Sequence, residues 1–120
     1  MTSAGKELID FQVKNYKSLE KWNKFEAGLV TQADLKSDEI IKNIIKKRSN
    51  FGILSEESRE DFNPELDKFF CVDPLCGTVP FSNNLNTWGL TVSFFSGDSS
   101  VGAIGCPGTK EYMHCDEKNV

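Results

Sequence analysis

An aspartate follows a run of apolar residues at the point where the chain turns. The run Phe69-Phe70-Cys71-Val72 has the composition of a buried strand, and Asp73 and Pro74 come directly after it. Ligands of open α/β sheets gather beyond the carboxyl ends of the strands, so Asp73 is the first candidate for chemistry. The following Gly77-Thr78 predicts the start of a short helix, whose free backbone N–H groups can bind an anion.

A second apolar segment also ends in acids. Residues 50–55 predict a short buried strand, and Glu56 and Glu57 follow it. Neighbouring strand side chains point to opposite faces, so only one of these acids reaches a given site if the strand persists that far. Carboxylate and carbonyl oxygens are the ligands that Mg²⁺ prefers, and a bound cation can lower the pKa of a water. The two strand ends predict a divalent cation that holds a phosphate; solvated acids with no function are the alternative.

Helical periodicity indicates two helices ahead of these strands. The first extends from about Glu7 to Phe25, and the second carries four isoleucines on one face and the basic run 46–48 at its end. Residues 26–33 predict a loop between them. The residues that define the two helix faces are Leu8, Phe11, Leu19, Trp22, Ile40, Ile41, Ile44 and Ile45.

The start of the second helix offers two possible caps. Asp34 or Ser37 can cap it, while Asp38 and Glu39 suit its first turn. Because a cap alone explains Asp34, these residues by themselves assign it no catalytic role.

The last third of the chain predicts strands. Residues 88–95 and 101–104 predict two strands, and the turn at Gly97-Asp98 between them indicates a hairpin. Gly105, Pro107 and Gly108 interrupt the pattern, and residues 111–114 start a further strand. Together with the helices, this predicts a mixed α/β fold.

Composition and charge bound the functions. The 120 residues predict a single domain, and a net charge of −4 argues against a nucleic-acid partner. The sequence shows neither a membrane-span stretch nor a signal-peptide core, which predicts a cytoplasmic protein with no membrane partner. The four cysteines are interpreted as free thiols, while a zinc site that uses them, with or without His114, and disulfides are the less favoured alternatives.

Three segments in order resemble the motifs of the inositol monophosphatase family. That family reads approximately L-V-T-x-x-D, G-E-E-S and I-D-P-I-D-G-T-x-x-F, and residues 90–93 and 101–107 resemble the hairpin that follows. The resemblance covers the chain from about Leu29 onward. The matching segments are Leu29-Val30-Thr31-Gln32-Ala33-Asp34, Ser55-Glu56-Glu57-Ser58 and Val72-Asp73-Pro74-Leu75-Cys76-Gly77-Thr78-Val79-Pro80-Phe81.

The resemblance implies a layered α/β (α+β) fold, in which two N-terminal helices pack on a mixed, largely antiparallel sheet. Residues 1–120 would then be a single domain that corresponds to the N-terminal, metal-binding part of the family fold. The implied activity is that of a hydrolase. A water activated by Mg²⁺, or by Mn²⁺ or another divalent ion, would hydrolyse a small phosphate monoester such as an inositol, sugar or nucleotide phosphate.

The resemblance also implies the ligands of the metal. Glu56, Asp73 and the backbone carbonyl of Leu75 would bind the first metal ion. Cys76 stands where the family has an aspartate that binds a second ion, and a thiol is a poor ligand for Mg²⁺. Members of the family are longer, and their C-terminal part supplies a further aspartate to the second ion. These differences predict impaired activity in this short chain.

Three residues would act on water and phosphate by the same resemblance. Thr78 and Asp34 would orient and activate the attacking water, and the backbone amides of Gly77 and Thr78 would bind the phosphate. The alternative function is that of a catalytically inactive or truncated relative that serves as a binding or assembly module. An exposed sheet edge and apolar surface would then favour a homo-oligomer or a partner chain.

Overall fold

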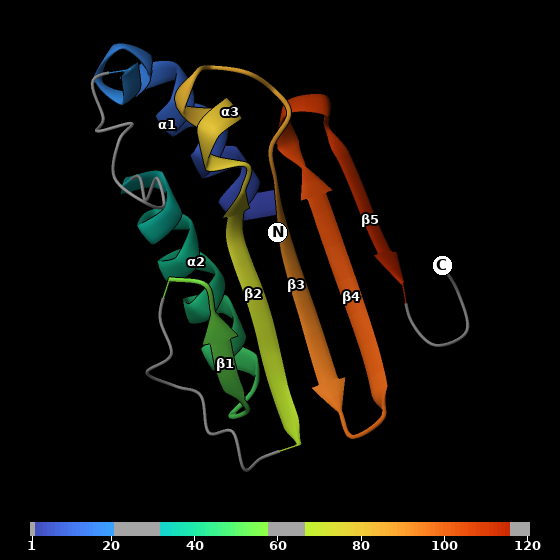
Figure 1. Ribbon diagram of the computed structural model, residues 1–120. Coiled ribbons are helices and arrows are strands. Elements are labelled where there is room, and N and C mark those ends of the chain that lie inside the picture. The colour runs from blue at the N-terminus through green and yellow to red at the C-terminus, as the bar shows by residue number, and fades with distance from the viewer. Residues whose placement is uncertain (1, 21–31, 58–66, 116–120) are drawn as a thin grey trace.

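The computed structural model describes residues 2–20, 32–57 and 67–115 (Figure 1). These ranges contain three α-helices, one 3₁₀ turn and five strands. Their bounds are α1 (Thr2–Glu20), α2 (Gln32–Arg48), β1 (Gly52–Ser55), β2 (Lys68–Cys76), α3 (Thr78–Ser82), β3 (Gly89–Ser96), β4 (Ser99–Cys106), η1 (Pro107–Thr109) and β5 (Glu111–Cys115).

The five strands form one sheet in the order β1-β2-β3-β4-β5. Strands β1 and β2 are parallel, while the pairs β2–β3, β3–β4 and β4–β5 are antiparallel. Figure 1 shows α1 and α2 on one side of the sheet and β5 at its outer edge. The expected fold, with two N-terminal helices on a mixed and largely antiparallel sheet, is confirmed.

The core lies between the helices and the sheet. The isoleucine stripe predicted for the second helix is confirmed, because Ile41 and Ile45 are buried and Ile40 and Ile44 are half-buried. Gln12 links α1 to α3 and to the loop after it, since its side-chain amide donates to the carbonyl oxygens of Phe81 and Leu85 at 3.1 Å each. The buried apolar residues are Ala4, Leu8, Ala33, Ile41, Ile45, Ile53, Val72, Leu75, Phe81, Trp88 and Leu90.

Both long helices begin earlier than the sequence pattern predicts. Helix α1 begins at Thr2 instead of about Glu7. Its predicted end, with Trp22 and Phe25, and residues 26–31 of the predicted loop lie outside the described residues. Helix α2 begins at Gln32, so the last two residues of that loop are helical. The sequence pattern does not reveal the first turns of these helices, because their buried residues, such as Ala4 and Ala33, are too small to form a recognisable apolar stripe.

Strand β2 runs further than expected. The sequence predicts that this strand ends at Val72, but it continues to Cys76. Its pairing with β3 shifts between Asp73, which lies opposite Thr91, and Cys76, which lies opposite Gly89. A bulge of this kind accommodates a proline within a strand, so Pro74 bends the strand without ending it.

The remaining strand predictions are confirmed. The hairpin of β3 and β4 turns at Gly97, whose φ of 59° lies in the left-handed region, and β5 follows as expected. Gly105 belongs to β4 instead of interrupting it, and the interruption begins at Pro107 in η1. No helix among the described residues is both long and apolar enough to cross a bilayer.

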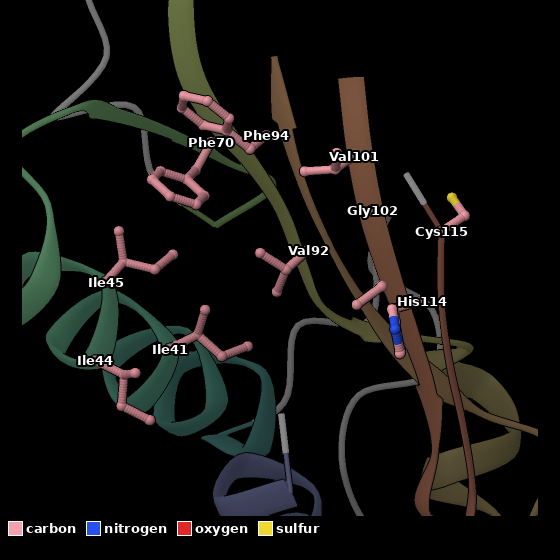
Figure 2. Close-up of a pocket in the computed structure, with 11 residues that line it drawn as sticks. Ile41, Ile44, Ile45, Phe70, Val92, Phe94, Val101, Gly102, His114 and Cys115 are labelled. Carbon is pink, nitrogen blue, oxygen red and sulfur yellow. The ribbon is translucent and has the colours of Figure 1, made fainter. Parts of the chain in front are cut away.

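An apolar groove opens between α2 and the outer strands. Figure 2 shows the isoleucines of α2 facing Phe70 and Val92 across this space, with His114 further along the sheet. The groove has a volume of about 440 Å³. Its lining residues are Ile41, Ile44, Ile45, Phe70, Val92, Phe94, Val101, Gly102, Ala103, His114 and Cys115. The helices therefore leave part of this face of the sheet uncovered.

Candidate metal and phosphate site

The parallel pairing of β1 and β2 brings Glu56, which follows β1, close to Asp73 near the end of β2. Ser55 lies opposite Val72, and the backbone N–H of Glu56 extends the pairing by donating to the carbonyl oxygen of Val72 at 3.1 Å. The side chains of Ser55 and Val72 are buried. Because strand side chains alternate, Glu56 and Asp73 both point to the opposite face. The register thus places two carboxyl groups side by side at one edge of the sheet.

Glu56 and Asp73 interact strongly. The main cause that raises the pKa of Glu56 to about 7 is a hydrogen bond that its protonated carboxyl donates to Asp73, and burial and the negative charges of Asp73, Glu57 and Asp34 add to it. A proton therefore lies between Glu56 and Asp73 near neutral pH. A cation that replaced this proton would relieve the same repulsion.

Glu57 is affected by Asp38 as well as by Asp73. Its pKa is raised by burial first, and then by the negative charges of Asp38 and Asp73. Its backbone N–H donates to the Ser55 hydroxyl at 3.3 Å. Of the two adjacent glutamates, Glu56 is the one with a hydrogen bond to Asp73, as the alternation of side chains predicts for a single site.

The end of β2 leads through a turn at Gly77 into α3. The backbone N–H of Leu75 donates to the Asp73 carboxylate at 3.3 Å, and the N–H of Phe81 donates to the carbonyl oxygen of Gly77 at 3.0 Å. Gly77 has a φ of 93°, and a Cβ at this position would meet the carbonyl oxygen of Thr87 at 3.0 Å. Glycine is therefore required at the turn, and Thr78 begins the helix as the sequence predicts.

Two neighbouring residues of α2 hold the ends of the strands. The hydroxyl of Ser37 donates to the carbonyl oxygen of Pro74 at 2.6 Å, and Asp38 accepts a hydrogen bond from the hydroxyl of Ser55. Asp38 also pairs with Lys42 at 3.4 Å. Ser37 and Asp38 thus fasten β2 and β1, respectively, directly beside the two acids.

The predicted cap roles at the start of α2 are wrong. Asp34 and Ser37 lie within the helix, and both are buried. Sequence reasoning missed the part that Ser37 and Asp38 play in supporting the strands. A signal for it was present, because positions 34, 37, 38, 41 and 45 follow helical spacing and continue the isoleucine face.

Cys76 carries a neutral thiol at neutral pH. Burial is the main cause that raises its pKa, and the negative charge of Asp73 and a hydrogen bond to it come next. The thiolate is the form that binds metals, so Asp73 works against metal binding at Cys76. All four cysteines are free thiols, as interpreted from the sequence.

The donor atoms fit a hard cation better than zinc. No group of three or more His, Cys, Asp or Glu side chains within the described ranges is placed to hold a metal ion. The paired carboxyls of Glu56 and Asp73 would therefore need backbone oxygen and water as further ligands. Mg²⁺ is bound in this way, through one or two carboxylates and several waters.

The predicted site residues come from three neighbouring segments. Asp34 lies in the first turn of α2 and acts electrostatically on Glu56, which follows β1. Asp73 and Leu75 belong to the end of β2, and Gly77 and Thr78 follow them at the start of α3. The structure thus groups the acids, while their roles in metal binding and catalysis stay predictions.

The stability of the metal-free chain should depend on the ionisation of Glu56. Its pKa is about 7 in the folded chain and about 4.5 when the chain is unfolded, so the folded state holds the proton more tightly. We therefore expect the free energy of unfolding to fall as the pH rises from about 4.5 to about 7. Glu56→Gln should reduce this slope, since a neutral amide has no proton to lose.

Urea unfolding in EDTA at a series of pH values measures this effect. Glu39→Gln, at an exposed position of α2, makes the same chemical change away from the acids and serves as the control. An equal slope in the wild type and in Glu56→Gln would contradict the shared proton.

The sequence and the structure both match a known family. A sequence profile of the inositol monophosphatase family matches residues 3–119. The chain belongs to the inositol monophosphatase family, which confirms the resemblance of its motifs. An inositol-1-monophosphatase from Rhizobium meliloti (strain 1021) is 35% identical over 104 aligned residues, and the match covers 84% of this chain and 38% of that protein.

Two solved structures show the same fold. Extragenic suppressor protein suhB from Bartonella henselae superposes with a TM-score of 0.79 at 30% identity, over 98% of this chain and 46% of that one. The inositol monophosphatase from Anabaena (Nostoc) sp. PCC 7120 superposes with a TM-score of 0.76 at 22% identity, over 96% of this chain and 40% of that one. The chain thus spans less than half the length of these relatives.

Proposed function

We propose that this chain is part of a metal-dependent phosphatase that hydrolyses a small phosphate monoester. It would carry the binding site of the first metal ion and the groups that bind the phosphate. Candidate substrates are inositol, sugar and nucleotide phosphates. The observation that carries the proposal is the parallel pairing of β1 and β2, which places the carboxyl groups of Glu56 and Asp73 side by side. Because the chain belongs to this family, we interpret the two adjacent carboxyl groups as ligands of one divalent cation.

Three oxygen donors would hold the cation. They are the carboxylates of Glu56 and Asp73 and the backbone carbonyl of Leu75, with Mg²⁺ as the proposed ion and Mn²⁺ as a substitute. A divalent cation bound there supplies Lewis-acid chemistry, because it polarises phosphate oxygens and lowers the pKa of water. The turn at Asp73 supports this arrangement, since the Leu75 N–H already orients one Asp73 oxygen at 3.3 Å.

Asp34 and Thr78 would prepare the attacking water. The Thr78 hydroxyl can accept a hydrogen bond from the water and pass one to a carboxylate. Asp34, which is only 1% exposed, would take up the proton at the buried end of this path. The backbone amides of Gly77 and Thr78 would donate to the phosphate oxygens.

We expect slow turnover. The neutral thiol of Cys76 leaves a second cation without the carboxylate that the family uses at this position. A second cation would stabilise the leaving oxygen, so its loss raises the barrier to hydrolysis. A cytoplasmic location stays a prediction of the sequence.

Release of inorganic phosphate tests the proposed function. The chain is incubated with a panel of inositol, sugar and nucleotide monophosphates and with Mg²⁺, Mn²⁺ or Zn²⁺. We expect slow release with Mg²⁺ or Mn²⁺, abolished in Asp34→Asn and increased in Cys76→Asp, which restores a carboxylate. Release that is equal in the wild type and in Asp34→Asn, or absent with every metal, would overturn the proposal for this chain.

A role as an assembly module is the second candidate function. The apolar groove along α2 and the position of β5 at the edge of the sheet favour it, because every residue of β5 is exposed within the described part of the chain. The occupant that we propose is a second copy of the chain, with the two β5 strands antiparallel about Met113. Glu111 would then lie opposite Cys115 of the partner, so no like charges would face each other.

The mass of the chain in solution tests this second candidate. Light scattering after gel filtration should give twice the mass of the chain, and Met113→Lys at the centre of the pairing should give a monomer. A wild-type chain that stays monomeric at all concentrations would overturn the pairing.

A further inference from the structure

The bulge in β2 takes the backbone directly after Asp73 out of the regular pairing of the sheet. The register with β3 shifts there, and Pro74 and Leu75 together lie opposite a single residue of that strand. A bulge removes its extra residue from the ladder of hydrogen bonds. Pro74 has no N–H to donate, and the residue is fully buried. Its carbonyl oxygen therefore needs a hydrogen-bond donor from outside the sheet.

Ser37 supplies this donor from α2. Its hydroxyl donates to the carbonyl oxygen of Pro74 at 2.6 Å, and its side chain is buried, so the bond is shielded from water. Helical spacing places Ser37 one turn after Asp34 and one turn before Ile41, on the buried face of α2. The packing of the whole helix thus holds the hydroxyl in its position.

The same peptide unit carries the N–H that orients Asp73. In a trans peptide, the carbonyl oxygen of Pro74 and the N–H of Leu75 lie in one rigid plane and point in opposite directions. The N–H donates to the Asp73 carboxylate at 3.3 Å, so Ser37 holds one end of the plane and Asp73 the other. Hydrogen bonds in such a chain polarise one another, and donation by the hydroxyl therefore makes the N–H a stronger donor.

The direction of the Leu75 carbonyl depends on the same plane. The side chain of Leu75 is buried in the core, which leaves this residue little freedom to rotate. Once Ser37 fixes the preceding peptide plane, the carbonyl that follows is fixed as well. Two of the three oxygen donors proposed for the cation, the Asp73 carboxylate and the Leu75 carbonyl, therefore depend on one hydroxyl of α2.

We propose that Ser37 is a positioning residue for the divalent cation, because its hydroxyl fixes the peptide that holds two of the cation's ligands in place. This role rests on the proposed function and deepens it, since Ser37 stands outside the set of proposed ligands. The alternative is that Ser37 only satisfies a buried carbonyl oxygen and contributes to stability. The two roles differ in what the loss of the hydroxyl does to the affinity for the cation.

Calorimetry with Mg²⁺ on two variants tests the role. Ser37→Ala removes the hydroxyl, and alanine is the best helix former. We expect it to bind one Mg²⁺ per chain about 10-fold more weakly than the wild type, as for the loss of a group that orients a ligand without binding the ion. Gln12→Met is the matched control, because it also removes a buried donor to backbone carbonyls, those of Phe81 and Leu85. It should lose stability to urea as Ser37→Ala does and keep the wild-type affinity for Mg²⁺.

Amide hydrogen exchange in EDTA gives a readout without metal or substrate. We expect the Leu75 amide to exchange about 10-fold faster in Ser37→Ala than in the wild type, in addition to any change that the urea data predict for the whole chain. Amides of β2 before the bulge, such as that of Phe70, should show only the change for the whole chain.

The outcomes separate this role from the proposed function. Equal affinity for Mg²⁺ in the wild type and in Ser37→Ala, or the same loss in Gln12→Met, would overturn the role of Ser37 and leave the metal site in place. An unchanged exchange rate of the Leu75 amide would also overturn it. A wild-type chain that binds no Mg²⁺ would instead overturn the phosphatase proposal, and the role of Ser37 with it.

Discussion

Replacing Asp73 with asparagine is expected to lower the affinity of the chain for Mg²⁺ by at least about 100-fold. Asp73 is the acid that hydrogen-bonds Glu56, and its oxygen is already oriented by the N–H of Leu75. An asparagine keeps the shape but removes the charge, and its amide donates where a cation would bind. Isothermal titration calorimetry with Mg²⁺ at pH 7.5 measures the loss.

The fold should survive this substitution. Asp73→Asn removes a negative charge from beside Glu56, so the metal-free variant should be at least as stable to urea as the wild type. Asp67→Asn is the matched control, because it makes the same change at an exposed position just before β2. Equal Mg²⁺ affinity in the wild type and in Asp73→Asn would mean that the metal ligands are misassigned.

Replacing Asp38 with alanine is expected to lower the free energy of unfolding by about 3 kcal/mol. The carboxylate accepts a hydrogen bond from the Ser55 hydroxyl and pairs with Lys42 at 3.4 Å, and both side chains of that ion pair are nearly buried. Removing Asp38 takes a counter-charge away from the nearly buried Lys42, which is costly in a poorly solvated position. Because domains are stable by only about 5–15 kcal/mol, this is a large share of the total.

Urea unfolding at pH 7 measures this effect. Glu39→Ala, at the exposed neighbouring position, should change stability by less than about 0.5 kcal/mol. Asp38→Ala should also weaken Mg²⁺ binding, since Ser55 directly precedes Glu56. A destabilisation below about 1 kcal/mol would show that Asp38 does not support the end of β1.

The local pattern of the sequence predicted most of the elements that carry the site. Apolar runs that end in Asp73 and in Glu56 marked two strand ends, and Gly77 marked the turn into α3. Their pairing could not be predicted from the residues, because nothing local specifies that β1 lies parallel to β2. The two acid-bearing strand ends predicted one metal site, the family motifs assigned Glu56 and Asp73 to it, and the register then placed these two acids side by side.

The errors have a common physical origin. Polar and small residues on a buried helix face do not produce an apolar pattern. The sequence pattern therefore indicates a helix cap or a first-turn residue at Asp34, Ser37 and Asp38, all of which are buried. Pro74 was interpreted as the end of a strand, because a bulge depends on the partner strand and is invisible in one segment. The roles of Ser37 and Asp38 depend in the same way on contacts with distant strands.

The number of Mg²⁺ ions that each chain binds tests the central claim most directly. Calorimetry at pH 6.5, in buffers of different ionisation enthalpy, gives the number of ions and the number of protons that binding releases. We predict one ion per chain and release of about one proton, because Glu56, with a pKa of about 7, is mostly protonated at this pH. Two ions per chain, no binding, or binding that releases no proton would contradict a single cation held by Glu56 and Asp73.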